Sequence, residues 1–155
     1  MIVTPSQSEL WSAGEQVCRQ FELGEIRQLE ALSHQGYSNF NARLETDLGA
    51  YVLRRYTEQP AEKINHELRL IDWLKAQGLP VVPPLRDPDG QARYTSDQEG
   101  PSPWIVFPFV EGEEPAPQPA IAHTMGGLVA RLHELPDQPW ENQNDDNLLS
   151  LQNTL

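Results

Sequence analysis

The sequence predicts an α+β fold, in which about five antiparallel strands are accompanied by one inserted helix. Three strand-like segments come early, a helical pattern follows the third, and a hairpin and an apolar strand precede a last helix. Strands that cluster around a single inserted helix indicate an α+β arrangement and not a doubly wound parallel sheet. The expected strands lie at about 23–33, 39–46, 49–56 and 103–109, with the hairpin at 81–95, and the expected helices at 6–21, 61–77 and 119–134.

The first two helices carry recognisable boundary signals. Ser6 or Ser8 can cap the first helix, because a serine side chain accepts a hydrogen bond from the first turn. The second helix follows Pro60, where the missing N–H costs nothing, and Gly78 with Pro80 ends it. These signals make the helix at 61–77 the clearest single element of the sequence.

The segments after the second helix predict a hairpin, a buried strand and a hinge. An Asp-Gly pair at 89–90 is flanked by short strand-like stretches and predicts the turn of the hairpin. "VEGEEPAPQP" is a linker rich in proline and glutamate and is the best candidate for a hinge. We therefore expect an N-terminal helix at 1–22, a lobe at 23–110, a hinge linker and helix at 111–135, and a polar tail at 136–155.

Composition and charge exclude several functional classes. The chain has 155 residues with 38% hydrophobic residues, which suits one globular domain. Eleven basic and 23 acidic residues give a net charge of −12, and the stretch 94–155 holds one basic and ten acidic residues. Nucleic acid is therefore not an expected partner, because phosphate backbones need clustered Lys and Arg. The absence of a signal peptide and of an apolar span, together with the single Cys18, predicts a cytoplasmic protein without a membrane segment.

A cation and a carboxylate are predicted to face each other between the third strand and the second helix. Strand alternation places Val52 and Arg54 on one face of the strand and Arg55 on the other. Glu67 lies at the edge of the apolar stripe of the helix, where a carboxylate is costly unless a cation meets it. A paired arginine and glutamate beside a pocket can hold a phosphate, because a guanidinium matches oxyanions. The alternative is that the arginines and Glu67 simply reach solvent.

The polar corner at 34–38 has two interpretations. Gly36 can bring the backbone close to a ligand, and Ser38 and Asn39 carry short polar groups that can cap a turn or contact phosphate oxygens. The corner is neither a Walker loop nor a GxGxxG motif, and by itself it is typical of an ordinary turn.

Four stretches in unbroken order resemble one known family. "GYSNFNARLET…GAYVLRRY", "EKINHELRLIDWLKAQGLPVVPPL", "PWIVFPFVEGEEP" and "GGLVARLHEL" look like the N-terminal lobe of the aminoglycoside phosphotransferase family. That family includes choline kinases and type II homoserine kinases, and its members have a protein-kinase-like fold. The resemblance covers about residues 23–135.

The resemblance implies a nucleotide site for ATP. Residues 34–39 would form the nucleotide-binding loop, with Gly36, Ser38 and Asn39 near the triphosphate. Arg54 would take the place of the strand lysine that grips the α- and β-phosphates, paired with Glu67, and Val52 would form a wall for adenine. The stretch from Phe107 through Pro108 to Val110 would be the hinge strand, offering the Pro108 carbonyl and the Val110 N–H to the adenine edge.

The sequence also departs from the family pattern. Arginine stands at 54 where many members have lysine, and the "HGDxxxxN" catalytic loop and the later metal-binding Asp are absent from the 155 residues. We therefore expect a truncated chain that binds ATP, with no catalytic or metal-binding residue of its own, and with Mg²⁺ only in the presence of the missing lobe. A small-molecule hydroxyl would be the acceptor in the full-length family. The alternatives are a non-catalytic nucleotide-binding module and an acidic protein-interaction module.

Overall fold

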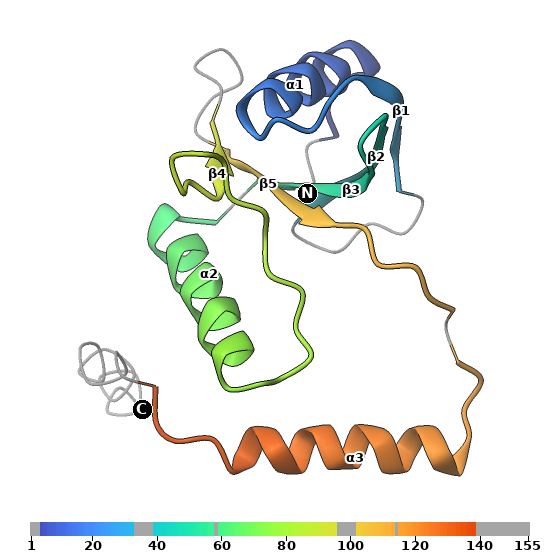
Figure 1. Ribbon diagram of the computed structural model, residues 1–155, viewed down its shortest axis with the longest axis vertical. Coiled ribbons are helices and arrows are strands. Elements are labelled where there is room, and N and C mark those ends of the chain that lie inside the picture. Colours follow the sequence, from blue (N-terminus) through green and yellow to red (C-terminus); the bar gives the residue numbers. More distant parts are fainter. Residues whose placement is uncertain (1–3, 33–38, 58, 96–101, 114, 139–155) are drawn as a thin grey trace, which may run out of the picture. The chain divides into compact units, whose positions relative to one another are not determined.

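The computed structural model describes residues 4–32, 39–57, 59–95, 102–113 and 115–138 (Figure 1). The chain divides into two units, Met1–Glu113 and Glu114–Leu155. The elements are, in chain order, α1 (Gln7–Gln20), β1 (Ile26–Ala31), β2 (Asn39–Thr46), β3 (Ala50–Tyr56), α2 (Ala61–Ala76), β4 (Arg93–Tyr94), β5 (Trp104–Pro108) and α3 (Pro119–His133). All except α3 belong to the first unit.

The strands form one five-stranded antiparallel sheet in the order β1-β2-β3-β5-β4. This confirms the predicted α+β class, and the three early strands lie within their predicted ranges. β3 is central, and the register places Arg54 opposite Asn41 on β2 and opposite Ile105 on β5. Residues that face the same side of these three strands therefore converge around Arg54.

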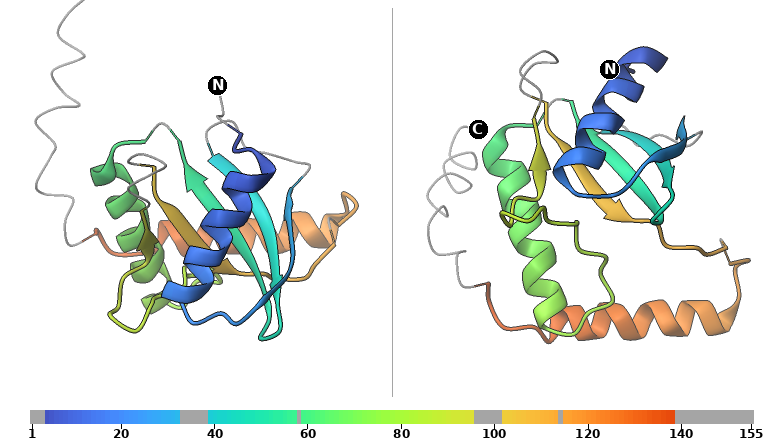
Figure 2. Two further views of the ribbon diagram at one scale, coloured as in Figure 1. Left: turned by 90° about the horizontal axis from the view of Figure 1, so that it is seen from above. Right: turned by 45° about the horizontal axis from the view of Figure 1, so that its top comes forward.

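Helix α1 covers one face of the sheet, as Figure 2 shows. Its N-terminus carries a capping box, in which Ser6 and Glu9 each bond the other's backbone N–H, so of the two serines considered it is Ser6 that caps the helix. Leu10 and Val17 of α1 pack against the buried side chains of the strands, and Phe40 meets Trp104 edge to face at 6.0 Å. This larger core holds the sheet in shape from the side opposite Arg54.

Helix α2 packs against the other face, beside β5 and β4 (Figures 1 and 2). Ile64 and Leu68 are its two buried residues, and they share a smaller core with Tyr56 and Ile105. The helix ends as expected at Gly78, which has φ 76°. Its N–H bonds the Lys75 carbonyl while the N–H of the next residue bonds Leu74.

The predicted hairpin at 81–95 is wrong. Only β4 is a strand in this range, and its partner is β5, not the stretch before the turn. Pro83 and Pro84 lack the N–H groups that a hairpin ladder needs, and the N–H of Leu85 instead bonds the Val106 carbonyl at 2.7 Å. The turn itself is present, because Gly90 has φ 79° and its N–H bonds the Asp87 carbonyl.

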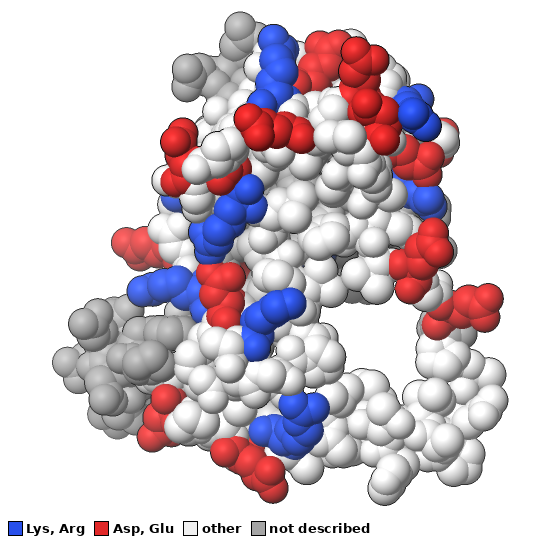
Figure 3. Space-filling model, in the orientation of Figure 1, with Lys and Arg blue, Asp and Glu red and all other residues white. Residues whose placement is uncertain are grey.

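The second unit contains α3 close to its predicted range. Helix α3 has no buried residue, and its apolar side chains Met125 and Leu132 are exposed. Figure 3 shows that basic and acidic side chains alternate over this view of the molecule and form no continuous basic patch. In the described parts of the chain, no helix is long and apolar enough to cross a membrane.

Candidate functional site

The side chain of Arg54 lies at the centre of a polar network on the α2 side of the sheet. Its Nε donates to Oδ1 of Asn41 at 3.1 Å, and its Nη1 lies 3.7 Å from Oε1 of Glu67. About a third of each partner of this ion pair is exposed, at 34% for Arg54 and 33% for Glu67. The structure therefore brings together the two charged residues that were expected to meet.

Tyr56 joins the same network from the end of β3. Its ring is buried, at 1% exposure, in the smaller core, and its hydroxyl donates to Oε1 of Glu67 at 2.6 Å. Burial raises the pKa of Tyr56 to about 12, and the hydrogen bond to Glu67 adds to the rise. The phenol is thus a neutral hydrogen-bond donor at any physiological pH. It donates to Oε1 of Glu67, which is also the oxygen nearest to Arg54.

Apolar side chains surround the guanidinium on the same face. Val52 lies opposite Phe107 in the register, and the guanidinium carbon of Arg54 is 5.1 Å from the centre of the Phe107 ring. Arg43 of β2 shares this face, but it pairs with Glu45 at 2.6 Å. Arg54 therefore combines a loose ion pair with Glu67 and an aromatic neighbour in Phe107.

The two arginines of β3 separate as predicted from strand alternation. Arg55 lies on the α1 side, with its guanidinium carbon 5.7 Å from the centre of the Trp104 ring. Arg54 lies on the α2 side with Glu67. Only one of the adjacent arginines is therefore available to the site.

The remaining predicted site residues are placed less completely. Gly36 and Ser38 lie outside the described residues. Asn39 begins β2 opposite Tyr56, and its Oδ1 is buried with no hydrogen-bond partner among the described residues. β5 ends at Pro108, after which the Phe109 N–H bonds the Ala50 carbonyl at 3.0 Å, and Val110 is exposed.

Asn41 and Tyr56 were not predicted from the sequence. Tyr56 follows Arg54 by two residues, so the same alternation that placed Arg54 could have placed it on that face. Asn41 requires the pairing register between β2 and β3, which no pattern within a single strand specifies.

A pocket of about 660 Å³ opens next to the network. Its lining includes Tyr56 and Ile64 of the smaller core, together with the polar side chains of Thr57, Gln59 and Arg93. In the described parts of the chain, no group of three His, Cys, Asp or Glu side chains could hold a metal ion. Tyr56 is the one residue of the network that lines this pocket, and Arg54, Asn41 and Glu67 are not part of its lining.

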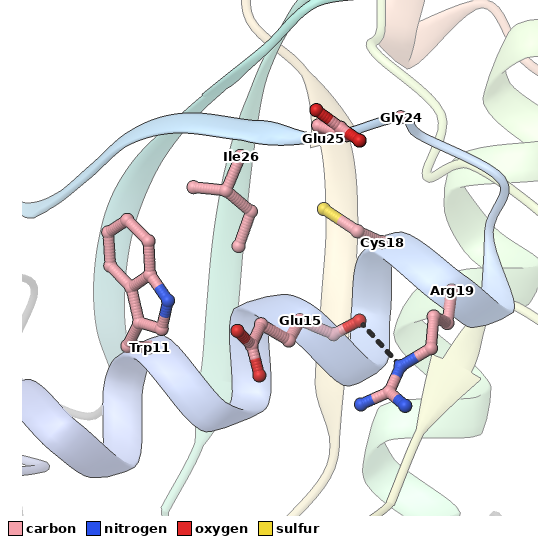
Figure 4. Close-up of a pocket in the computed structure, with 7 residues that line it drawn as sticks. All are labelled: Trp11, Glu15, Cys18, Arg19, Gly24, Glu25 and Ile26. Carbon is pink, nitrogen blue, oxygen red and sulfur yellow. Dashed lines mark hydrogen bonds between the residues drawn. The ribbon is translucent and has the colours of Figure 1, made fainter.

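A second pocket, of about 580 Å³, lies between α1 and the start of β1 (Figure 4). Trp11 and Ile26 line one side of it, and Nε of Arg19 donates to the backbone carbonyl of Glu15 at 3.4 Å. Burial raises the pKa of the Cys18 thiol to about 11, and Asp47 and Glu15 add to the rise, so the thiol is protonated at neutral pH. This pocket contains none of the predicted site residues.

Comparison with known proteins identifies the family. The model of the phosphotransferase enzyme family (APH) matches residues 29–152. The chain belongs to this family. Among curated relatives of the chain, the homoserine kinase of Methylobacillus flagellatus is 28% identical over 131 residues, which is 84% of this chain and 38% of that protein. The homoserine kinase of Burkholderia cenocepacia is 31% identical over 115 residues, or 74% of this chain and 34% of that protein.

A solved structure of an aminoglycoside phosphotransferase shares the fold. Spectinomycin phosphotransferase, in complex with ADP and spectinomycin, matches with a TM-score of 0.69 at 14% identity, over 87% of this chain and 40% of that chain. This confirms the protein-kinase-like arrangement expected from the resemblance. The chain thus spans between 34% and 40% of the length of these proteins.

Proposed function

We propose that residues 23–110 form the ATP-binding lobe of a small-molecule phosphotransferase, which moves the γ-phosphate of ATP to a substrate hydroxyl. The observation that carries the proposal is Arg54, a cation held between Asn41 and Glu67 beside an apolar wall. Phosphoryl transfer depends mainly on positioning and charge stabilisation, so a cation fixed next to a base-binding surface is the part that such a lobe supplies.

Each predicted residue takes a role within this proposal. Arg54 contacts the α- and β-phosphates, Glu67 orients it, and Val52 and Phe107 line the adenine side. The hinge from Phe107 to Val110 offers the Pro108 carbonyl and the Val110 N–H to the adenine edge. Gly36 and Ser38, which precede β2 in the sequence, contact the triphosphate together with Asn39, the first residue of β2.

The 155-residue chain is proposed to bind nucleotide without transferring phosphate. The sequence contains no "HGDxxxxN" stretch, and a general base alone contributes about 10²–10⁴ to a rate. Mg²⁺ is expected to enter with residues that lie outside this sequence. The homoserine kinases among the relatives make homoserine the first acceptor to test with any longer form of the protein. The cytoplasmic location expected from the sequence is part of the same proposal.

Thermal unfolding with and without ADP or ATP tests the proposal. A ligand that binds the folded chain at ten times its Kd stabilises it by about 1.4 kcal/mol, which raises the Tm of a domain of this size by several degrees. We expect this rise for the wild-type chain and for Arg55→Ala, whose side chain faces α1, and no rise for Arg54→Ala.

Two results would count against the proposal. A wild-type chain whose Tm does not respond to millimolar ADP or ATP would exclude a nucleotide lobe and leave the interaction-module alternative. An equal response in Arg54→Ala would show that nucleotide binds elsewhere. Robust ATP-dependent phosphorylation by the 155-residue chain would overturn its proposed inactivity.

A further inference from the structure

Each charged group of the site lies closer to a neutral neighbour than to the opposite charge. Nη1 of Arg54 and Oε1 of Glu67 are 3.7 Å apart, which exceeds the length of a direct hydrogen bond. Asn41 approaches Arg54 to 3.1 Å, and the Tyr56 hydroxyl approaches Glu67 to 2.6 Å. Each charge therefore has its own closer partner.

These two contacts divide the hydrogen-bonding capacity of the guanidinium. Arginine carries five N–H donors, and Asn41 accepts from the one at Nε, which lies nearest the strand. The Tyr56 hydroxyl donates to the oxygen of Glu67 that faces Arg54, and the Arg54 side chain also interacts with this hydroxyl, where it lowers the pKa of Tyr56 against the larger effect of burial. The guanidinium donors that neither Asn41 nor Tyr56 engages are left for another oxyanion.

The two neutral partners stand on rigid strands, whereas Glu67 stands on a helix. Asn41 lies directly opposite Arg54 in the β2–β3 register, and Tyr56 lies two residues after Arg54 on the same face of β3. The Tyr56 ring is buried in the smaller core, so its hydroxyl has little freedom to move. Asn41 and Tyr56, which both lie on the sheet, therefore set the distance between the two charges.

We propose that Asn41 and Tyr56 are positioning residues of the nucleotide site, which hold Arg54 and Glu67 apart so that the guanidinium keeps donors for a phosphate. This inference rests on the proposed function and deepens it. Without the Tyr56 hydroxyl, the Glu67 carboxylate forms its charge-assisted bond with Arg54 instead, and the nucleotide must break that bond to gain the cation.

Calorimetric titration of the full 155-residue chain with ADP and with adenosine tests the inference. Tyr56→Phe removes the hydroxyl and leaves the buried ring. We expect it to weaken ADP binding about tenfold, since a hydrogen bond to a charged group contributes at this level, and to leave adenosine binding unchanged. Asn41→Ala is expected to act in the same direction. Tyr51→Phe, on the opposite face of β3, is the matched control and leaves both affinities unchanged.

A second substitution separates positioning from a merely structural role, with Glu67→Gln alone as the reference. In Tyr56→Phe/Glu67→Gln, no carboxylate competes for Arg54, so this variant is expected to bind ADP as Glu67→Gln does, to within about threefold. A chain damaged only in its packing would lose ADP affinity in both backgrounds. If Tyr56→Phe does not fold, the comparison of Asn41→Ala/Glu67→Gln with Glu67→Gln decides the question by the same criterion.

The outcomes distinguish this inference from the function beneath it. Wild-type chain that binds neither ADP nor adenosine overturns the nucleotide lobe, and the inference with it. If the wild-type chain binds ADP and both Tyr56→Phe and Asn41→Ala bind it with the same affinity, the inference is overturned and the proposed function is not. If these two variants lose affinity for adenosine and for ADP in equal proportion, the inference is also overturned, because the substitution would then not act through the contact with phosphate.

Discussion

Nη1 of Arg54 lies 3.7 Å from Oε1 of Glu67, and about a third of each side chain is exposed. Ion pairs at this level of exposure contribute at most about 1 kcal/mol, because solvent screens them. A double-mutant cycle with Arg54→Met and Glu67→Gln, followed by urea unfolding, should therefore give a coupling energy of about 1 kcal/mol or less. The matched cycle with Tyr56→Phe and Glu67→Gln should give about 1.5–3 kcal/mol, because that contact is a short bond to a charged group. The reverse order of the two values would contradict the geometry.

Because the phenol of Tyr56 is buried, the free energy of unfolding of the chain depends on pH in the alkaline range. An ordinary tyrosine has a pKa near 10, and burial raises the pKa of Tyr56 to about 12 in the folded chain. Neutral Tyr56 therefore contributes to the free energy of unfolding in full below pH 10, and this contribution is lost as the pH rises through about 12. The total loss amounts to about 2–3 kcal/mol. Urea unfolding between pH 9 and 12 should show this loss in the wild-type chain relative to Tyr56→Phe. Parallel curves for the two proteins would refute the shift.

The single cysteine should be a slow nucleophile. Burial raises the pKa of Cys18 to about 11, so the thiolate fraction near neutral pH is about a hundredfold lower than for an ordinary thiol. We expect iodoacetamide to label the folded chain far more slowly than the urea-unfolded chain at pH 7.5, as read by mass spectrometry. Because Cys18 is the only cysteine, one added group reports on this site alone. Equal rates in both states would mean that the thiol is neither buried nor shifted.

Gly24 should tolerate no side chain. Its φ is 84°, and a Cβ placed on it would lie 2.0 Å from Oδ1 of Asp47, the oxygen that accepts the Glu25 N–H at 2.7 Å. Gly24→Ala combines a left-handed backbone with displacement of that carboxylate, and should destabilise the chain by about 2–3 kcal/mol in urea unfolding. Gly90→Ala is the control, because φ is 79° but a Cβ meets nothing within 4 Å, and it should cost about 1–2 kcal/mol. If Gly24→Ala lowered the free energy of unfolding no more than Gly90→Ala does, displacement of the Asp47 carboxylate would not contribute to the effect.

The elements with local signals were predictable, and so was the charge pair. Strand alternation separated Arg54 from Arg55, and Gly78 marked the end of α2, because both effects depend on near neighbours in sequence. The helical stripe placed Glu67 at the edge that meets β3. The pair is therefore a consequence of two independent periodicities that happen to converge.

Features that depend on pairing between distant segments were not predictable. The 81–95 stretch has the turn residues of a hairpin, but prolines before the turn remove donors, and Leu85 bonds β5 instead. Asn41 joins the site through the β2–β3 register, which involves residues 13 positions apart. The Tyr56 hydroxyl contact needs the orientation of α2 relative to the sheet, and no single segment encodes that orientation.

The small core under α2 has a consequence for how the site responds to a ligand. Only Ile64 and Leu68 of this helix are buried, whereas α1 and the strands share a much larger core on the far side of the sheet. A small displacement of α2 therefore disturbs few contacts, and it carries Glu67 with it while Arg54 stays in place on β3. Local opening of α2 at lower free energy than global unfolding would break the bond between Tyr56 and Glu67 and so release the spacing that Tyr56 sets. Glu67 thus lies on an element with few buried residues, and Arg54 lies on the central strand of the sheet.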